Sequence, residues 1–290
     1  MYNINMINDA IILVNPSHRI GCIVKLSKKY NFTPICVLTM GNSFAFDYEQ
    51  NFNNIKKLNN HVEVYRTYEN GTTPNELSAI LKSKYNVQAV VPYEEDLKYA
   101  EELASVLGVA GNDVSTVNIR KDKYNFNELL SKNSVRSVKQ MMIEKNTTAD
   151  DVVKYFNNTF PIVIKPIDGV LSVSVYICKN ENEVHDAING KNTFMSKFVA
   201  QEFIDGNEYI VNFITYKNKH HLTNICVYDR RVVNGHVINF GYQYITKQDD
   251  LFNSLMNYGI NVLNASKVNC GTTHLEIKID KKGPVLIECN

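Results

Sequence analysis

The sequence has almost no net charge and no strong compositional bias. Its formal net charge is +1 over 290 residues, and like charges occur in short runs mixed with the opposite sign. This balance offers no electrostatic footprint for a nucleic acid or an acidic membrane surface. The chain also lacks internal repeats and low-complexity segments, and 44% of its residues are hydrophobic. Together these features indicate a globular protein of about two domains.

Cysteine pairs, basic leader residues and long apolar runs are missing as well. None of the six cysteines forms a C-x-x-C pair, and most stand within apolar runs. Buried thiols in a reducing cytosol are therefore favoured over disulfides or a zinc site. The first residues lack a basic segment, and no apolar run approaches the roughly 20 residues that a membrane helix needs. We expect a soluble, cytoplasmic protein with no membrane partner.

Strand and helix signals alternate over residues 1–115. Short apolar runs predict strands at residues 10–18, 32–40, 62–68 and 87–93. Helical spacing or favourable first-turn residues predict helices at residues 20–30, 74–85 and 94–111. Strands that alternate with helices are typical of βαβ units, so this region predicts a mostly parallel sheet.

The pattern changes near residue 115, where we place a domain boundary. Residues 113–151 predict a helical and basic region, and longer strands follow from Phe160 onward. Strands are predicted at residues 161–166, 174–179, 198–204, 208–216, 221–229, 236–245, 273–280 and 283–290, with helices at 181–189 and 248–266. This order is typical of an α+β region with antiparallel pairing.

Residues 273–290 predict a hairpin that carries acidic side chains. Glu276 lies on its first strand, and Glu288 and Asn290 lie on its second. Because residues two apart share a face of a strand, Glu288 and Asn290 point the same way. Two carboxylates and an amide oxygen would form the oxygen-rich site that Mg²⁺ prefers. The same alternation also fits glutamates on a solvated strand face, so the pattern leaves both interpretations open.

A lysine ends one of the most apolar strands. Lys165 follows the apolar residues 160–164, and an ammonium group there loses hydration free energy unless it meets an anion. A short turn at residues 168–174 follows, and its backbone N–H groups and a serine hydroxyl could hold a phosphate. The turn is not a Walker loop, because no G-x-x-x-x-G-K-[ST] occurs in the chain.

The segment "VAQEFIDGNEY" places polar residues between two strands. Gln201 and Glu202 follow an apolar run, an Asp-Gly turn comes next, and Glu208 begins the following strand. The backbone at such a turn could hydrogen-bond an adenine edge, and a carboxylate could accept ribose hydroxyl groups. By itself the segment is equally well explained as a strand, a turn and a strand.

In their order along the chain, these motifs resemble the ATP-grasp superfamily. The series runs from Lys123 through "VIKP", "IDG-x-x-S", "QEFIDGNEY" and "H-x-E" to "GPVLIECN". Residues 90–113, 208–231 and 271–290 resemble the L-amino-acid ligase branch, which makes dipeptides and related amides. The resemblance implies an α/β Rossmann-like pre-ATP-grasp domain at residues 1–115. It also implies two α+β ATP-grasp subdomains, one at 116–199 with the phosphate loop and one at 200–290 with the metal site.

The resemblance implies roles in holding ATP. Lys123 and Lys165 would contact its phosphates, with Lys165 also near the adenine pocket, and Ser172 would lie in the flexible loop that covers the phosphates. The residues that would hold the adenosine are Gln201, Glu202 and the backbone around Phe203 and Ile204 for adenine, and Glu208 for ribose.

The resemblance also implies a metal site. Glu276, Glu288 and Asn290 would bind one or two Mg²⁺ (or Mn²⁺) ions that bridge the phosphates. His274 would lie beside them as a catalytic candidate, on the same strand face as Glu276. A hydrogen-bonded structural histidine is an equal alternative for that position.

The implied activity is ATP-dependent joining of a carboxylate to an amine through an acyl phosphate, with amino acids or small peptides as substrates. Positioning and electrostatics supply most of the catalysis in such phosphoryl transfer. Family members are often dimers, so a homodimer is one implied arrangement. A carboxylase or carbamoyl-phosphate-type subunit is less favoured, because nothing suggests a biotin-accepting segment.

The chain departs from the family pattern in two places. Leu171 and Ser174 stand where family members usually carry glycines, and leucine resists the backbone conformations that glycine allows. The family also continues past the asparagine that matches Asn290, with an arginine-containing segment that forms much of the substrate pocket. We therefore expect a truncated chain or one that ends there naturally. The alternative function is a degenerate or truncated relative that binds ATP without ligase turnover.

Overall fold

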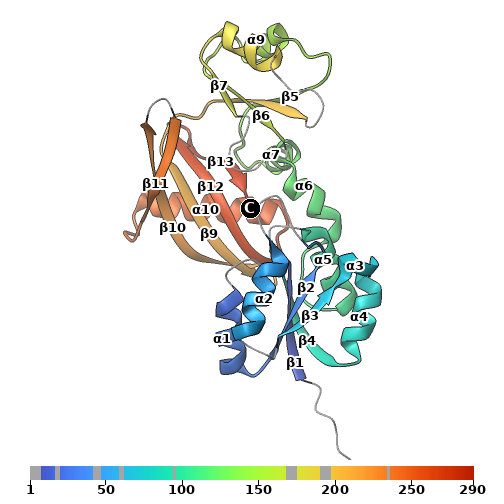
Figure 1. The fold of residues 1–290 in the computed structure, drawn as a ribbon. Helices are drawn as coiled ribbons and strands as arrows, with labels where there is room; N and C mark the ends of the chain where they lie inside the picture. Colours follow the sequence, from blue (N-terminus) through green and yellow to red (C-terminus); the bar gives the residue numbers. More distant parts are fainter. Residues whose placement is uncertain are drawn as a thin grey trace, which may run out of the picture. The chain divides into compact units, whose positions relative to one another are not determined.

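The computed structural model describes residues 8–16, 20–41, 47–58, 62–93, 96–167, 175–189, 197–233 and 236–290. The chain divides into two compact units. The N-terminal unit is Met1–Val117 with the short pieces Tyr216–Lys219 and Asn269–Gly271, and the C-terminal unit contains the other residues. Figure 1 shows the helices and strands of both units. The domain boundaries expected near residues 115 and 199 stay a prediction.

The N-terminal unit is built around a parallel sheet. Its strand order is β3-β2-β1-β4, and every neighbouring pair is parallel. The strands are β1 (Asn8–Val14), β2 (Thr33–Leu38), β3 (Glu63–Arg66) and β4 (Tyr85–Pro92). The helices are α1 (Ile20–Tyr30), α2 (Tyr48–Leu58), α3 (Thr67–Asn70), α4 (Pro74–Lys82) and α5 (Leu97–Leu107), followed by the short η1 (Val114–Thr116). The predicted α/β class is confirmed, and α2 is an addition that the sequence analysis missed.

Local sequence signals set the ends of these helices. The Thr73 side chain accepts a hydrogen bond from the backbone N–H of Glu76, and the Glu76 carboxylate accepts one from the backbone N–H of Thr73. This reciprocal cap, with Pro74 in the first turn, fixes the start of α4. Helix α5 ends at Gly108, whose φ of 77° lies in the left-handed region that glycine adopts readily.

The C-terminal unit contains two sheets, of which the first is a small antiparallel one. Its strand order is β5-β8-β6-β7, with β5 (Gln140–Ile143), β8 (Phe198–Glu202), β6 (Ile162–Pro166) and β7 (Tyr176–Cys178). Helices α8 (Ala149–Tyr155) and α9 (Glu181–Asn189) pack on one face of it, where Val152 and Val184 meet Ile162 and Ile164 in a buried cluster (Figure 1). This face is therefore apolar and closed.

The structure corrects one part of the predicted helical region at residues 113–151. Helices α6 (Val117–Lys121), α7 (Lys123–Lys132) and α8 are present, but Gln140–Ile143 forms strand β5 between α7 and α8. The segment pairs with β8 from Gln140↔Gln201 to Ile143↔Phe198. A run of four residues is too short to show a period, so only this long-range pairing identifies it as a strand.

The second sheet of the C-terminal unit is larger and curves over one long helix. Its strand order is β11-β10-β9-β12-β13. The elements are β9 (Glu208–Tyr216), β10 (Lys219–Val233), β11 (His236–Tyr244), α10 (Asp250–Ala265), β12 (Cys270–Asp280) and β13 (Gly283–Cys289). Leu255 and Val262 of α10 pack against Phe213 and Leu275 of the sheet in a buried core (Figure 1). The predicted α+β class and antiparallel hairpin are confirmed.

All six cysteines are free thiols. Cys36, Cys178 and Cys226 are buried, whereas Cys22 is exposed. Among the described residues, no helix is both long and apolar enough to cross a bilayer.

The segment between β8 and β9 presses closely on strand β12. Gly206 has a φ of +145°, and a Cβ atom there would lie 2.1 Å from the backbone oxygen of Ile279. We expect Gly206→Ala to lower the free energy of unfolding by about 3 kcal/mol, because both the close approach and the backbone angle exclude a side chain. Urea unfolding would measure this loss.

Gly283→Ala is the matched control for this prediction. Gly283 also has a positive φ, +106°, but a Cβ there meets nothing within 4 Å. Its substitution should cost only the backbone strain, about 1 kcal/mol. Equal losses in the two variants would show that the contact of Gly206 with β12 is not tight.

Candidate functional site

The hairpin of β12 and β13 brings four predicted residues onto one strand face. Glu276 lies directly opposite Glu288 in the strand register. Two residues away, the backbone N–H groups of His274 and Asn290 each donate to the other's carbonyl oxygen, at 2.7 and 2.9 Å. Because alternate residues share a face, all four side chains project to the same side. The sequence predicted a shared face for the two residues of each strand, and the strand register shows that both pairs lie on the same face of the hairpin.

Lys165 projects from the face of the small sheet that the helices leave open. Ile162 and Ile164 of β6 pack toward α8 and α9, so the alternation turns Lys165 the other way. The residue is only 8% exposed. Burial, and after it the positive charge of Lys123, lower the pKa of its ammonium group to about 8 against the opposing charges of three glutamates. Those glutamates are Glu288, Glu276 and Glu208.

Lys123 stands at the first position of α7 and joins the same cluster. Its Nζ lies 3.0 Å from a carboxylate oxygen of Glu288. Its backbone N–H donates to the carbonyl oxygen of Ile167, at 3.2 Å, just beyond the end of β6. The start of α7, the end of β6 and the second strand of the hairpin therefore meet at one place. Sequence alone gave Lys123 no distinction among its basic neighbours.

Gln201 and Glu202 make structural contacts in the segment expected to read adenine. Gln201 is buried, and its amide donates to the side-chain oxygen of Gln140 at 3.1 Å. The Glu202 carboxylate accepts from the backbone N–H of Lys139 at 2.7 Å. Both side chains therefore hold the end of β8 in place, and in this way they position the backbone that follows it.

Phe203 and Ile204 follow β8 and lie against the hairpin. Ile204 is buried with Val285 and Val138 in a small apolar cluster. The carbonyl oxygen of Ile204 accepts a hydrogen bond from Lys278 Nζ at 3.2 Å, and the same ammonium group lies 5.2 Å from the centre of the Phe203 ring. The expected adenine-reading backbone is thus fixed against β12.

Glu208, the expected ribose ligand, is a buried carboxylate with one oxygen engaged. Its side chain is 9% exposed, and Oε2 accepts from Arg230 at 2.6 Å. Oε1 is buried, and no group in the described part of the chain donates to it. Burial raises the pKa of this carboxyl group, and the nearby charge of Glu276 raises it further, against the opposing charges of Arg230 and Lys278.

Glu276 is held by residues of β10 that the sequence did not single out. The hydroxyl of Tyr228 donates to Glu276 Oε1 at 2.9 Å, and Arg230 Nη2 and His274 Nε2 lie 3.9 and 3.8 Å from the same oxygen. Burial alone would raise the pKa of Glu276, but these three neighbours outweigh it and the pKa is lowered. The carboxylate is therefore held in its charged form. Alternation along β10 was the one available signal for Tyr228 and Arg230.

His274 has a defined partner on its other side. Its Nδ1 lies 2.9 Å from the side-chain oxygen of Asn212, whose amide donates to Asn224 at 2.8 Å. Both roles left open by the sequence, a catalytic and a structural histidine, are compatible with this contact. Ser172 and the glycine-poor turn around it lie outside the described residues.

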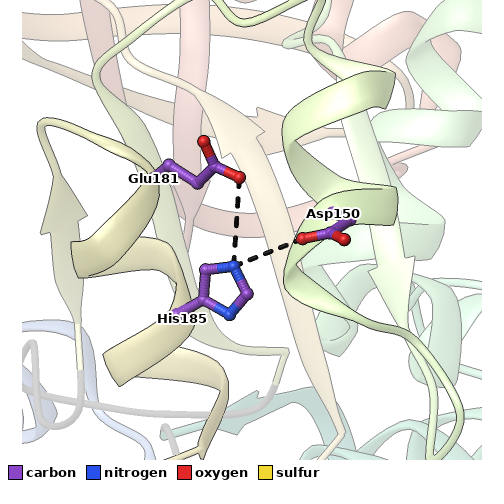
Figure 2. Close-up of side chains that lie close together, drawn as sticks. All are labelled: Asp150, Glu181 and His185. Atoms are coloured by element: carbon purple, nitrogen blue, oxygen red, sulfur yellow. Dashed lines mark ion pairs between the residues drawn. The ribbon is translucent and has the colours of Figure 1, made fainter.

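A second titratable cluster lies on other elements and was not predicted. His185 Nε2 lies 3.2 Å from Asp150 of α8 and 4.0 Å from Glu181, one turn earlier on α9. Figure 2 shows the imidazole pointing between the two carboxylates. In the described part of the chain, this is the one set of three His, Cys, Asp or Glu side chains close enough to share a metal ion. All three side chains are substantially exposed, so the set is accounted for as a surface ion-pair cluster that joins α8 to α9, with a small effect on stability.

A known protein family matches the part of the chain that contains β6 and the hairpin. Residues 158–290 match the family described as the ATP-grasp domain. This range contains the strand that carries Lys165 and both strands of the hairpin. Residues 158–290 are an ATP-grasp domain. The resemblance inferred from the order of the motifs is therefore confirmed at the level of the superfamily.

Two proteins of known activity are similar to this chain in sequence. Dapdiamide A synthase of Enterobacter agglomerans is 28% identical over 179 residues, which are 58% of this chain and 41% of that protein. The coenzyme gamma-F420-2:alpha-L-glutamate ligase of Methanocaldococcus jannaschii is 28% identical over 114 residues, 38% of this chain and 39% of that protein. The matches thus span about two fifths of the length of each relative.

A solved structure has a fold similar to that of nearly the whole chain. The L-amino acid ligase from Bacillus licheniformis has a TM-score of 0.67 and 16% sequence identity, and the match covers 98% of this chain and 66% of that one. At this identity the likeness establishes the fold alone.

Proposed function

We propose that the protein is an ATP- and Mg²⁺-dependent carboxylate–amine ligase that forms an amide bond on an amino acid or small peptide. The observation that carries this proposal is the buried ammonium of Lys165 with Glu288, Glu276 and Glu208 as its charged neighbours. Burying these charged groups costs desolvation free energy, and three carboxylates leave excess negative charge beside the ammonium group. Nucleotide phosphates would pair with the ammonium group, and the metal ions that accompany them would pair with the carboxylates.

The residues fit a nucleoside triphosphate. Glu208 Oε1 is a buried acceptor that no described group satisfies, which suits a ribose hydroxyl as the donor. Lys165 and Lys123 supply cations for phosphate oxygens. Ser172, by its place in the motif series, would add a hydroxyl in the loop that covers them. The backbone of Phe203 and Ile204 would read the base.

The hairpin fits a hard divalent cation. Glu276 and Glu288 face each other, and Asn290 adds an amide oxygen on the same face. Such an all-oxygen set suits Mg²⁺ or Mn²⁺, which would neutralise phosphate charge when bound. Glu276 already has a lowered pKa, so it offers a charged ligand at neutral pH.

The proposed reaction has two steps. A substrate carboxylate oxygen attacks the γ-phosphorus and ADP leaves, which gives an acyl phosphate. The amine of the second substrate then attacks the acyl carbon, phosphate leaves and the amine gives up a proton. In this proposal Lys165, Lys123 and Arg230 would offset the negative charge on the transferred group, and the covering loop would exclude water.

Amino-acid substrates are favoured by the names of the similar proteins. One is called an L-amino acid ligase and another an alpha-L-glutamate ligase. Both names describe the joining of an amino acid. A homodimer and a cytoplasmic location belong to the same proposal.

The test is product formation with a substrate panel. The protein with ATP, Mg²⁺ and pairs of amino acids should release ADP and phosphate only when substrate is present, and mass spectrometry should show an amide. ATP binding without any such release would support the alternative of a non-catalytic ATP-binding protein. Neither binding nor release would refute the proposed function.

A further inference from the structure

Lys278 links two parts of the proposed site that are far apart in sequence. It lies on β12, two residues after Glu276. Its Nζ donates to the carbonyl oxygen of Ile204 at 3.2 Å and lies 5.2 Å from the centre of the Phe203 ring. Its charge also opposes the rise in the pKa of Glu208 that burial causes. One ammonium group therefore bears on the segment proposed to read the base and on the carboxylate proposed to hold the ribose.

The segment at residues 203–206 is held against β12 on both sides of this contact. Ile204 is buried beside Val285 of β13. Gly206 approaches the backbone of Ile279 so closely that no side chain fits between them. The carbonyl oxygen that Lys278 contacts is therefore held in place by the packing on both sides of it.

The contacts of this ammonium group place it where it can also meet a base. Three N–H groups are available to a lysine, and Ile204 uses one. A cation beside an aromatic face is attracted to a second aromatic face as well, and purines offer both such a face and acceptor nitrogens. The groups that carry the phosphate proposal are different ones, Lys165 and Lys123, on β6 and α7.

We propose that Lys278 is a specificity-determining residue that contributes the base-dependent part of nucleotide affinity. It ties the reading segment to the metal-binding strand and places an ammonium group against a bound purine. This inference rests on the proposed nucleotide site and adds to it a residue that the motif series did not mark.

The experiment separates the base from the phosphates by using three ligands. Isothermal titration calorimetry would measure the affinity of wild-type protein and Lys278→Met for MgATP, MgADP and magnesium tripolyphosphate. ATP and ADP share a base and ribose, whereas tripolyphosphate has neither. Lys278→Met should weaken MgATP and MgADP by the same factor, about tenfold, and leave tripolyphosphate unchanged. The ratio of the ATP and ADP affinities should therefore stay constant.

Two further variants keep the result interpretable. Lys281→Met removes the same charge from the exposed turn of the hairpin and should bind all three ligands as the wild type does. Lys278→Arg keeps a cation and should retain most of the ATP affinity. This variant tests the role of the charge even if Lys278→Met does not fold. Thermal unfolding would show that each variant is folded.

Distinct outcomes separate failure of this inference from failure of the proposed function. Unchanged MgATP affinity in folded Lys278→Met, or a changed ATP-to-ADP ratio, would overturn the role of Lys278 and leave the nucleotide site standing. Wild-type protein that binds no MgATP would overturn both. Equal weakening of ATP and tripolyphosphate would assign Lys278 to the phosphates and contradict a base-specific role.

Discussion

Lys165→Met should weaken MgATP binding by about 100-fold, the scale expected when one partner of a buried charge interaction is removed. The side chain is buried, and its charged neighbours come from the hairpin and from α7. Methionine has a similar length but no charge. Calorimetric titration with MgATP would measure the loss.

The same substitution should make the protein without nucleotide more stable. The pKa of Lys165 is lowered from 10.5 to about 8, so the charged form, which still predominates at pH 7, costs more free energy in the folded state than in the unfolded chain. Removing it should raise the free energy of unfolding by roughly 1–3 kcal/mol at pH 7. A gain in stability with a loss of binding identifies a residue retained for function.

The pH dependence of stability follows from the same shift. Between about pH 8 and pH 10.5 the unfolded chain keeps a proton on Lys165 that the folded protein has lost. The unfolded state therefore binds more protons, and the free energy of unfolding of the wild type should rise with pH through this window. Lys165→Met should lack this rise.

Lys179→Met is the control for these measurements. Lys179 lies just after β7, the strand that pairs with β6, and is exposed. Its substitution should change neither MgATP affinity nor the stability at pH 7. If Lys165→Met and Lys179→Met behaved alike, the burial of Lys165 would have no functional meaning.

Glu288→Gln should change ATP affinity in opposite directions with and without metal. With Mg²⁺ present, the variant loses a metal ligand, so the affinity for ATP should fall about tenfold or more. With EDTA present, the variant has lost a negative charge that repels the phosphates and competes for Lys123, so the affinity should rise. Calorimetry under the two conditions would measure both effects.

Asp280→Asn is the matched control on the same hairpin. Asp280 is paired with Arg136 at 2.6 Å and takes no part in the proposed site. Its substitution should leave the metal dependence of ATP binding unchanged. A fall in ATP affinity for Glu288→Gln both with and without Mg²⁺ would contradict a metal-binding role for Glu288.

Sequence patterns predicted the fold well where the period is long or the strands are strongly apolar. The parallel pairing around β1 and the hairpin of β12 and β13 were predicted from such signals. Strand β5 could not be predicted, because four residues show no period and its identity depends on pairing with β8. Its Gln140 is polar and yet buried, because its side chain accepts a hydrogen bond from Gln201 and donates to Tyr124 and Glu128.

The candidate site was predictable where a residue contradicts its surroundings. Lys165 is a cation at the end of an apolar strand, and that contradiction alone suggested an anion. Tyr228, Arg230 and Lys278 carry no such local signal, because polar residues on an alternating strand are ordinary. Their roles depend on register and on contacts across the sheet, which appear only in three dimensions.

Titration of the wild-type protein with MgATP tests the central claim most directly. The account predicts saturable binding of one nucleotide for each chain, weakened strongly when EDTA removes the metal and weakened again in Lys165→Met. Wild-type protein that shows no binding up to about millimolar MgATP, or binding that Lys165→Met leaves unchanged, would contradict it.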